Sequence, residues 1–271
     1  MEEEGARWPH RSSKPAWQPL RLPEGSTPSP LRRHRRMTTF QRTALLLIAT
    51  WLGVVGIRFR RSTIVLVGGL FAIGFYTAVS LARGTVSADE LGLGIPGRPL
   101  VTIGLVLVWW ALMLAYSPLA DRLATRWFAK PPTLQSFRAI QQSTVKLAAG
   151  ILVAWVLGGI LEELAFRGIA LRSIGLWLAA WLPVPIAAAC AVGLAALGAG
   201  VIHIYQGSRA VAIIVQLSVL FGVLFVISGY SLWAVILCHG LYDTVAFIRF
   251  ANKKSRYSNL ERDAPSAFVK S

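Results

Sequence analysis

Charged residues are scarce in this chain, and their scarcity excludes most soluble folds. Only 15% of the 271 residues are charged, whereas 55% are hydrophobic. A soluble domain has about 25% charged residues, because water must hydrate its surface. The composition therefore indicates an integral membrane protein.

Acidic residues and cysteines are also few. The chain has 12 Asp and Glu against 28 Lys and Arg, a net charge of +16. The basic residues gather in the tails and in short loops, so we interpret them as topology signals and contacts with membrane lipids rather than as a nucleic-acid surface. Cys190 and Cys238 lie within apolar runs, which predicts neither a disulfide framework nor a metal cluster.

Two basic tails are expected to flank one membrane domain, residues 42–250. Residues 1–41 contain six prolines and no apolar periodicity, so they cannot bury enough surface to offset the entropy of ordering. We expect a disordered N-terminal tail there, with no cleavable signal peptide, and a second tail at 251–271.

The membrane domain contains a series of long apolar windows. A helix needs about 20 apolar residues to cross the hydrocarbon core. The windows lie at 43–57, 62–82, 100–119, 147–166, 186–205, 210–228 and 231–248. Because the first window is short, we expect an all-α integral membrane protein, a bundle of six to seven transmembrane helices with a site in the bundle interior.

Two segments between the windows are expected to lie at the membrane surface. Residues 121–146 contain two adjacent prolines and are interpreted as a loop with an interfacial helix. Residues 168–182 carry two tryptophans ahead of two prolines, so we expect a surface-lying or half-inserted helix there.

The distribution of Lys and Arg predicts the orientation, because cytoplasmic loops carry an excess of both. If 43–57 does not cross, the two tails, residues 58–61, the loop 121–146 and Arg209 share one side. We therefore expect an even number of crossings and both tails on the cytoplasmic side of the cytoplasmic membrane. A full crossing by 43–57 would place the C-terminal tail outside.

Ionisable residues are rare inside the apolar windows, yet five occur. Between residues 122 and 260 the carboxylates are Glu162, Glu163 and Asp243, and the histidines are His203 and His239. An ionisable group at membrane depth costs a few kcal/mol, so it usually faces a cavity and marks a functional site. The five residues predict one polar cavity.

Helical spacing divides these residues by face. Glu163 can pair with Arg167, four residues on, while Glu162 points about 100° away and is free to hold a water or a metal ion. His239 and Asp243 are also four apart, and the remaining histidine must converge from a separate helix. A purely structural Glu163–Arg167 pair, or a relay in an ion- or proton-coupled transporter, stays open as an alternative.

The motifs resemble those of the CAAX protease and bacteriocin-processing (CPBP, or Abi) family of intramembrane proteases. That family has Glu-Glu-x-x-x-Arg, Phe-x-x-x-His and His-x-x-x-Asn/Asp motifs, in this order on separate transmembrane helices. This chain has Glu162-Glu163-Leu-Ala-Phe-Arg167, then His203, then His239-Gly-Leu-Tyr-Asp243. The resemblance covers residues 100–250, and Ala199 stands where the second motif has its aromatic residue.

The resemblance implies an intramembrane endopeptidase whose substrate is a membrane-associated, possibly prenylated CAAX-type, peptide or protein. It assigns roles to six residues of this chain: Glu162, Glu163, Arg167, His203, His239 and Asp243. Glu162 would be the general base that activates water, and Glu163 and Arg167 would hold it in position. His203, His239 and Asp243 would bind a metal ion, or would polarise the scissile carbonyl and stabilise the oxyanion. The missing aromatic residue leaves a non-catalytic scaffold or immunity protein as a further alternative.

The metal requirement stays open. A bound zinc ion lowers the pKa of water to about 7, and Glu162, His203 and His239 could supply its three protein ligands. A metal-free glutamate can also act as the base. The chain lacks the His-Glu-x-x-His signature of common zinc proteases. The sequence predicts either one divalent ion such as zinc or none.

Overall fold

The computed structural model describes residues 37–57 and 63–263, and these residues form helices with no strand among them. Seven segments of the described chain are long and apolar enough to cross a membrane. They are Thr39–Ile57, Ile64–Ala82, Pro99–Thr125, Thr144–Leu178, Val184–Val201, Ser208–Ile227 and Leu232–Asn252. The all-α membrane fold predicted from the sequence is confirmed.

Helices α2 and α3 open the membrane domain. Helix α2 (Thr39–Ile57) packs beside α3 (Thr63–Ala82) and also contacts α8 and η3. Its buried residues Phe40, Ala44, Ile48, Trp51 and Val55 recur every three or four positions along one face. At about 1.5 Å per residue, the 19 residues of α2 reach about 28 Å, close to the thickness of the hydrocarbon core.

The segment 121–146 is helical at both ends. Helix α5 (Pro99–Thr125) continues beyond its expected end, and a 3-10 helix, η1 (Gln135–Gln141), follows the prolines. Helix α6 (Thr144–Ala154) then begins after Ser143, whose side chain caps it by accepting from the Lys146 amide. The segment interpreted as a loop with an interfacial helix thus contains a 3-10 helix.

The next membrane segment is longer than predicted. Helix α6 continues without a break through two π-helical stretches, η2 (Trp155–Glu162) and η3 (Leu164–Leu171), into α7 (Arg172–Leu178). The expectation of a separate surface-lying helix at 168–182 is corrected, because residues 168–171 are buried and helical. No proline occurs between Thr144 and Pro183, so nothing stops the helix at the end of the apolar window.

Small side chains bring α8 (Val184–Val201) close to α9 (Ser208–Ile227). The buried residues of α8 include Ala187, Ala191, Ala195 and Ala199, which recur every four positions on one face. Small residues let helices in membranes approach closely, where lipid provides no hydrophobic drive for association. The turn between α8 and α9 contains the short η4 (Ile204–Gln206).

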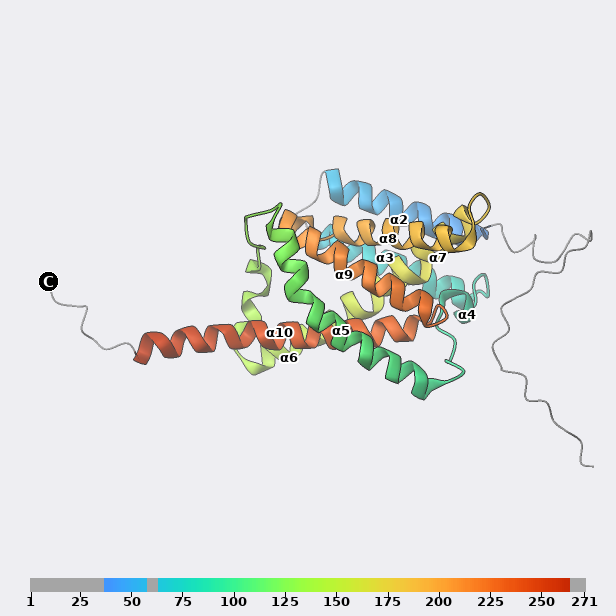
Figure 1. Cartoon of the computed structure of the whole chain (residues 1–271). Coiled ribbons are helices and arrows are strands. Elements are labelled where there is room, and N and C mark those ends of the chain that lie inside the picture. Colours follow the sequence, from blue (N-terminus) through green and yellow to red (C-terminus); the bar gives the residue numbers. More distant parts are fainter. Residues whose placement is uncertain (1–36, 58–62, 264–271) are drawn as a thin grey trace, which may run out of the picture. The chain divides into compact units, whose positions relative to one another are not determined.

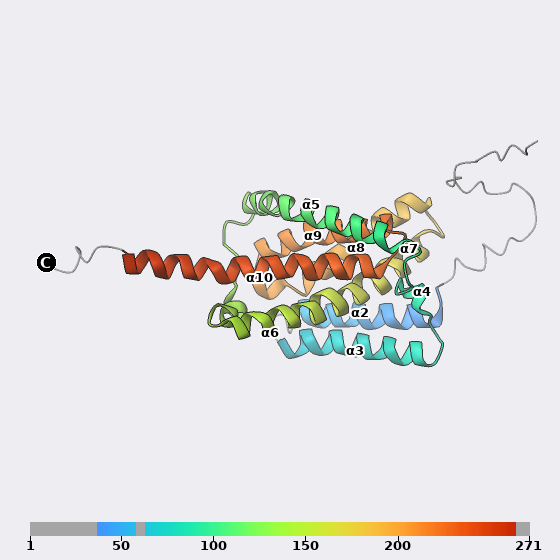
Figure 2. The same ribbon diagram turned by 90° about the horizontal axis from the view of Figure 1, so that it is seen from below.

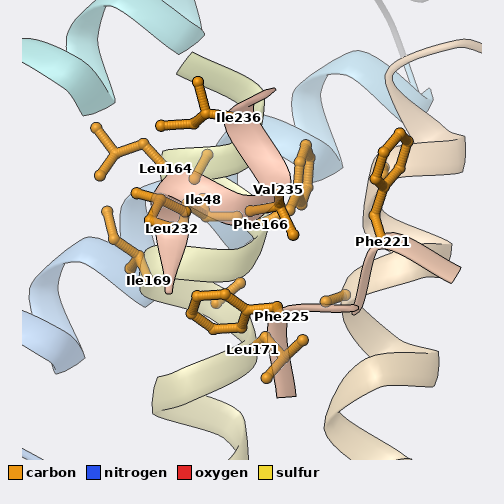
Figure 3. Packing of buried hydrophobic residues seen from close by; sticks show 14 of the residues in the cluster. Ile48, Leu164, Phe166, Ile169, Leu171, Phe221, Phe225, Leu232, Val235 and Ile236 are labelled. Atoms are coloured by element: carbon orange, nitrogen blue, oxygen red, sulfur yellow. The ribbon is translucent and has the colours of Figure 1, made fainter. Parts of the chain in front are cut away.

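Helix α10 (Leu232–Asp263) runs between α5 and the α6–η2 segment (Figure 1, Figure 2). The first part of the predicted C-terminal tail thus belongs to this helix, while residues 1–36 and 264–271 lie outside the described residues. Figure 3 shows the core where η3 meets α10, with Phe166 and Ile169 among the side chains that gather near Leu232 and Val235. This packing fixes the two helices that carry the first and third motifs.

Hydrogen bonds define the two ends of the bundle. At one end, the backbone amide of Thr133 donates to the carbonyl of Gln206, and the side-chain Nε2 of Gln141 donates to the carbonyl of Phe250. This end, called the basic end below, holds seven of the described Lys and Arg residues: Arg122, Arg126, Lys130, Arg138, Lys146, Arg209 and Arg249. At the opposite end, the amide of Leu232 donates to the carbonyl of Gly92 beside α4 (Ala88–Leu91).

Candidate active site

The first motif contains a fully buried ion pair. Nη1 of Arg167 donates to Oε1 of Glu163 at 3.1 Å, and the two side chains are 3% and 0% exposed. The predicted pairing of these residues is confirmed. Arg167 lies in the π-helical stretch η3, and Glu163 stands between η2 and η3. π-type hydrogen bonding occurs mostly in single turns and often at functional sites.

Helix α9 holds the other side of the Arg167 guanidinium. Nη2 donates to the carbonyl oxygen of Ser218 at 2.9 Å and to its hydroxyl at 2.6 Å. The guanidinium also lies 5.5 Å from the centroid of the Phe221 ring, a cation–π contact. Arg167 therefore fixes Glu163 relative to a second helix.

His239 is held on three sides. Its Nδ1 lies 2.6 Å from Oε1 of Glu163, its Nε2 lies 3.4 Å from Oδ2 of Asp243, and its ring stacks on Phe221 at 4.6 Å. Because a carboxylate accepts and does not donate, we assign the Nδ1 proton to His239. The predicted approach of His239 to Asp243 is present, and Glu163 adds a contact that the spacing did not predict.

Glu162 points away from the buried pair, as helical geometry predicts. Its Oε1 lies 4.0 Å from Nε2 of His203, and its carboxylate interacts electrostatically with His239 and Asp243. The side chain of Glu162 is 14% exposed and that of His203 is 18% exposed. Glu162 thus stands between the second and third motifs, with part of its surface accessible.

His203 follows the end of α8 by two residues and is oriented by its own backbone. Nδ1 lies 2.9 Å from the carbonyl oxygen of Ala199, so the ring presents Nε2 towards Glu162. A main-chain carbonyl makes this contact whatever side chain residue 199 carries. The departure from the family pattern at Ala199 therefore leaves the orientation of His203 intact.

Tyr205 is a neighbour of Glu162 that the sequence did not single out. Burial raises the pKa of the Tyr205 phenol, the hydrogen bond from Gln206 lowers it, and the Glu162 carboxylate raises it again. The phenol therefore stays neutral at physiological pH and keeps a hydrogen to donate. Its ring stacks on His203 at 6.2 Å, and its position two residues after His203 is the signal that could have identified it.

The structure thus brings the six predicted residues into one cluster. Glu163 and Arg167 form its buried part, whereas Glu162, His203, His239 and Asp243 keep side-chain exposures between 14% and 24%. Two cavities, of about 550 and 490 Å³, lie elsewhere: one is lined by Arg98 and Arg172, the other by residues of α2 and α3. Neither is the polar cavity that the sequence predicts around the six residues.

The cluster does not form a ready metal site. Among the described residues, no group of three or more His, Cys, Asp or Glu side chains is arranged to hold a metal ion. Nε2 of His203 lies 4.0 Å from Glu162, and Nε2 of His239 lies 3.4 Å from Asp243, whereas zinc needs three protein ligand atoms that converge about 2 Å from one point. The described side chains therefore do not present Glu162, His203 and His239 as a ready ligand set, and a bound metal ion stays a prediction.

Comparison with known proteins identifies the segment that carries the cluster. Residues 144–245 match the family described as type II CAAX prenyl endopeptidase Rce1-like. No curated protein and no solved structure matches the chain. The match begins with α6 and ends within α10, so it includes all six predicted site residues. The segment that carries the candidate site is therefore similar to the Rce1-like family, and this match confirms the resemblance to the CPBP family of intramembrane proteases.

Proposed function

We propose that this protein is an intramembrane endopeptidase in which Glu162 activates the attacking water. The observation that carries the proposal is the position of Glu162, 4.0 Å from His203 and beside the His239–Asp243 pair, within the Rce1-like segment. Among the described residues, the ion-pair partner of Glu162 is His203 at 4.0 Å, not an arginine like the one that holds Glu163, so the Glu162 carboxylate is available to take a proton.

The reaction needs one proton acceptor and one stabiliser of negative charge. Glu162 removes a proton from water, and the resulting hydroxide attacks the scissile carbonyl carbon. The tetrahedral intermediate then collapses, the carbon–nitrogen bond breaks, and Glu162 returns the proton to the leaving nitrogen. A general base of this kind typically contributes about 10² to 10⁴ in rate.

The histidines act on the carbonyl oxygen in this proposal. His239 in its protonated form donates Nδ1–H to Glu163 and presents Nε2–H, with Asp243 3.4 Å from Nε2. Nε2 of His203 faces the same space from the turn after α8. Hydrogen-bond donors fixed in advance at a developing oxyanion are among the largest contributors to catalysis.

The substrate class that we propose is a membrane-associated protein with a prenylated CAAX-type C-terminus, in line with the description of the matching family. The test uses full-length protein in proteoliposomes with two matched peptides, one farnesylated and one carrying the same sequence without the lipid. We expect cleavage of the farnesylated peptide at least about tenfold faster, the effect of about 1.4 kcal/mol of differential binding. Equal rates would overturn the substrate class, and no cleavage of either peptide would overturn the endopeptidase.

The same proteoliposomes distinguish cleavage from the alternative function, transport. A proton-coupled carrier built on Glu162 and Asp243 would change the internal pH of the vesicles on addition of its substrate and would cleave nothing. A scaffold would do neither. The Rce1-like match favours cleavage.

We propose that the basic end of the bundle faces the cytoplasm, because cytoplasmic loops carry the excess of Lys and Arg. The turn that holds His203 lies at this end, since its residue Gln206 bonds to Thr133 of the loop after α5. Substrate would thus reach the cluster from the cytoplasmic side. The prediction that both tails are cytoplasmic further requires that α2, although long enough, does not cross completely.

A further inference from the structure

We infer that Gly158 is a positioning residue of the proposed endopeptidase: its missing side chain keeps open the space beside Nε2 of His239. The inference rests on the proposed function for its catalytic consequence and on geometry for the open space. Gly158 is a buried residue of η2, four positions before Glu162.

The surroundings of Gly158 are the reactive atoms themselves. A Cβ atom at this position would lie 3.1 Å from Oδ2 of Asp243, 3.2 Å from Nε2 of His239 and 3.5 Å from Cε1 of the same ring. The first two distances are shorter than ordinary carbon contacts, so an alanine would press on the imidazole and the carboxylate together. Nδ1 of His239 is held at 2.6 Å by Glu163, and the ring is stacked on Phe221, so it has little freedom to retreat.

The neighbouring residue provides a matched control. Gly159 is also buried in η2, but a Cβ there would meet the carbonyl oxygen of Ile236 at 3.5 Å and atoms of Gly240 at 3.8 Å. These are ordinary van der Waals distances, and neither neighbour belongs to the cluster. Alanine should gain the same helix propensity at both positions. The two variants therefore differ in what the added methyl group touches.

The geometry separates a positioning role from simple helix packing. If Gly158 served only to let η2 approach α10, alanine at either position would act mainly on stability. If Gly158 keeps the space beside Nε2 open, Gly158→Ala should change the chemistry at His239 while the fold persists. A displacement of about 1 Å in an active site can reduce the rate by about 10²-fold.

The experiment compares wild type, Gly158→Ala and Gly159→Ala as full-length protein in proteoliposomes. With the farnesylated peptide, we expect Gly158→Ala to lower kcat by about tenfold or more with little change in KM, and Gly159→Ala to keep kcat within about twofold. Thermal unfolding in detergent should show Gly158→Ala to be no less stable than Gly159→Ala. Equal kcat values for the two variants, or a loss of stability confined to Gly158→Ala, would overturn the inference.

A second readout does not depend on cleavage. Diethyl pyrocarbonate modifies accessible imidazoles in their neutral form, which for His239 keeps the proton on Nδ1 and leaves Nε2 free to react. Mass spectrometry can measure the modification of His239 and His203 separately in each variant. We expect Gly158→Ala to slow modification of His239 by a factor of several relative to His203, and Gly159→Ala to leave the ratio unchanged. An unchanged ratio in Gly158→Ala overturns the inference. Absence of cleavage in the wild type together with the expected ratios would overturn the proposed function and leave the open space at His239 established.

Discussion

Oε1 of Glu163 lies 2.6 Å from Nδ1 of His239, although the two residues are 76 positions apart in the chain. The same oxygen accepts from Arg167 at 3.1 Å. One buried oxygen therefore joins the first motif to the third. The ion pair of Glu163 and Arg167 is buried, as a structural pair would be. Glu163 also sets the orientation of the His239 imidazole.

The first prediction concerns the stability of this arrangement. Arg167→Met leaves the Glu163 carboxylate buried without its cation, and loss of one partner of a buried pair typically costs about 3–5 kcal/mol. We expect Arg167→Met to be much less stable than the double variant Glu163→Gln/Arg167→Met. Unfolding in detergent for wild type, both single variants and the double variant measures the coupling. Strictly additive losses would contradict a coupled pair.

The second prediction treats His239 and Asp243 as one unit. His239→Ala removes a donor to the oxyanion and should lower the cleavage rate by about 10² to 10³. Asp243→Asn should be milder, because the amide retains the size and one acceptor oxygen. The double variant should lose little more than His239→Ala alone, since residues acting together are strongly non-additive. A double variant showing the simple sum of two losses would count against a shared site.

The third prediction concerns metal ions. The metal-ligating side chains of the described residues do not converge on one point. We therefore expect the cleavage rate to fall by less than about twofold after dialysis against a chelator. Loss of a catalytic metal ion would remove several kcal/mol of transition-state stabilisation and would lower the rate far more. The assay should be repeated after addition of zinc. Loss of activity that zinc restores would establish a metalloprotease and would require the side chains to rearrange.

The fourth prediction is topological. Single cysteines are introduced at residues 5 and 268 in a background where Cys190 and Cys238 are replaced by alanine, and intact cells are treated with an impermeant thiol reagent. Both tails should react only after permeabilisation, as the charge distribution predicts. Labelling of either tail alone would make α2 a full crossing. Labelling of the C-terminal position would in addition contradict the cytoplasmic assignment of the basic end.

Sequence patterns predicted the parts of the molecule that depend on local chemistry. Apolar windows of span length located the seven described segments that are long and apolar enough to cross a membrane, because lipid requires each such segment to satisfy its own backbone as a helix. Four-residue spacing predicted the Glu163–Arg167 pair. The continuation of the helix through residues 168–178 was missed, because Trp177 and Trp181 ahead of the prolines were interpreted as a membrane-surface signal, whereas the helix that begins at Thr144 runs on to Leu178.

Contacts that arise only in the folded bundle could not be predicted. Ser218 and Phe221 are ordinary residues of an apolar helix until α9 brings them to Arg167. Gly158 has no side chain to mark it, and its position beside His239 follows from how η2 packs on α10. The bond between Glu163 and His239 likewise depends on two helices distant in sequence.

The most direct test of the central claim is the cleavage rate of Glu162→Gln in proteoliposomes. Glutamine keeps the size of the side chain but cannot take a proton from water, so the rate should fall by about 10² to 10⁴ while expression and unfolding match the wild type. Asp121→Asn is the matched control, since it removes a carboxylate whose partner is Arg209 at the surface of the basic end, where an ion pair is worth about 0–1 kcal/mol. It should retain the wild-type rate. Undiminished cleavage by Glu162→Gln would contradict the assignment of Glu162 as the general base.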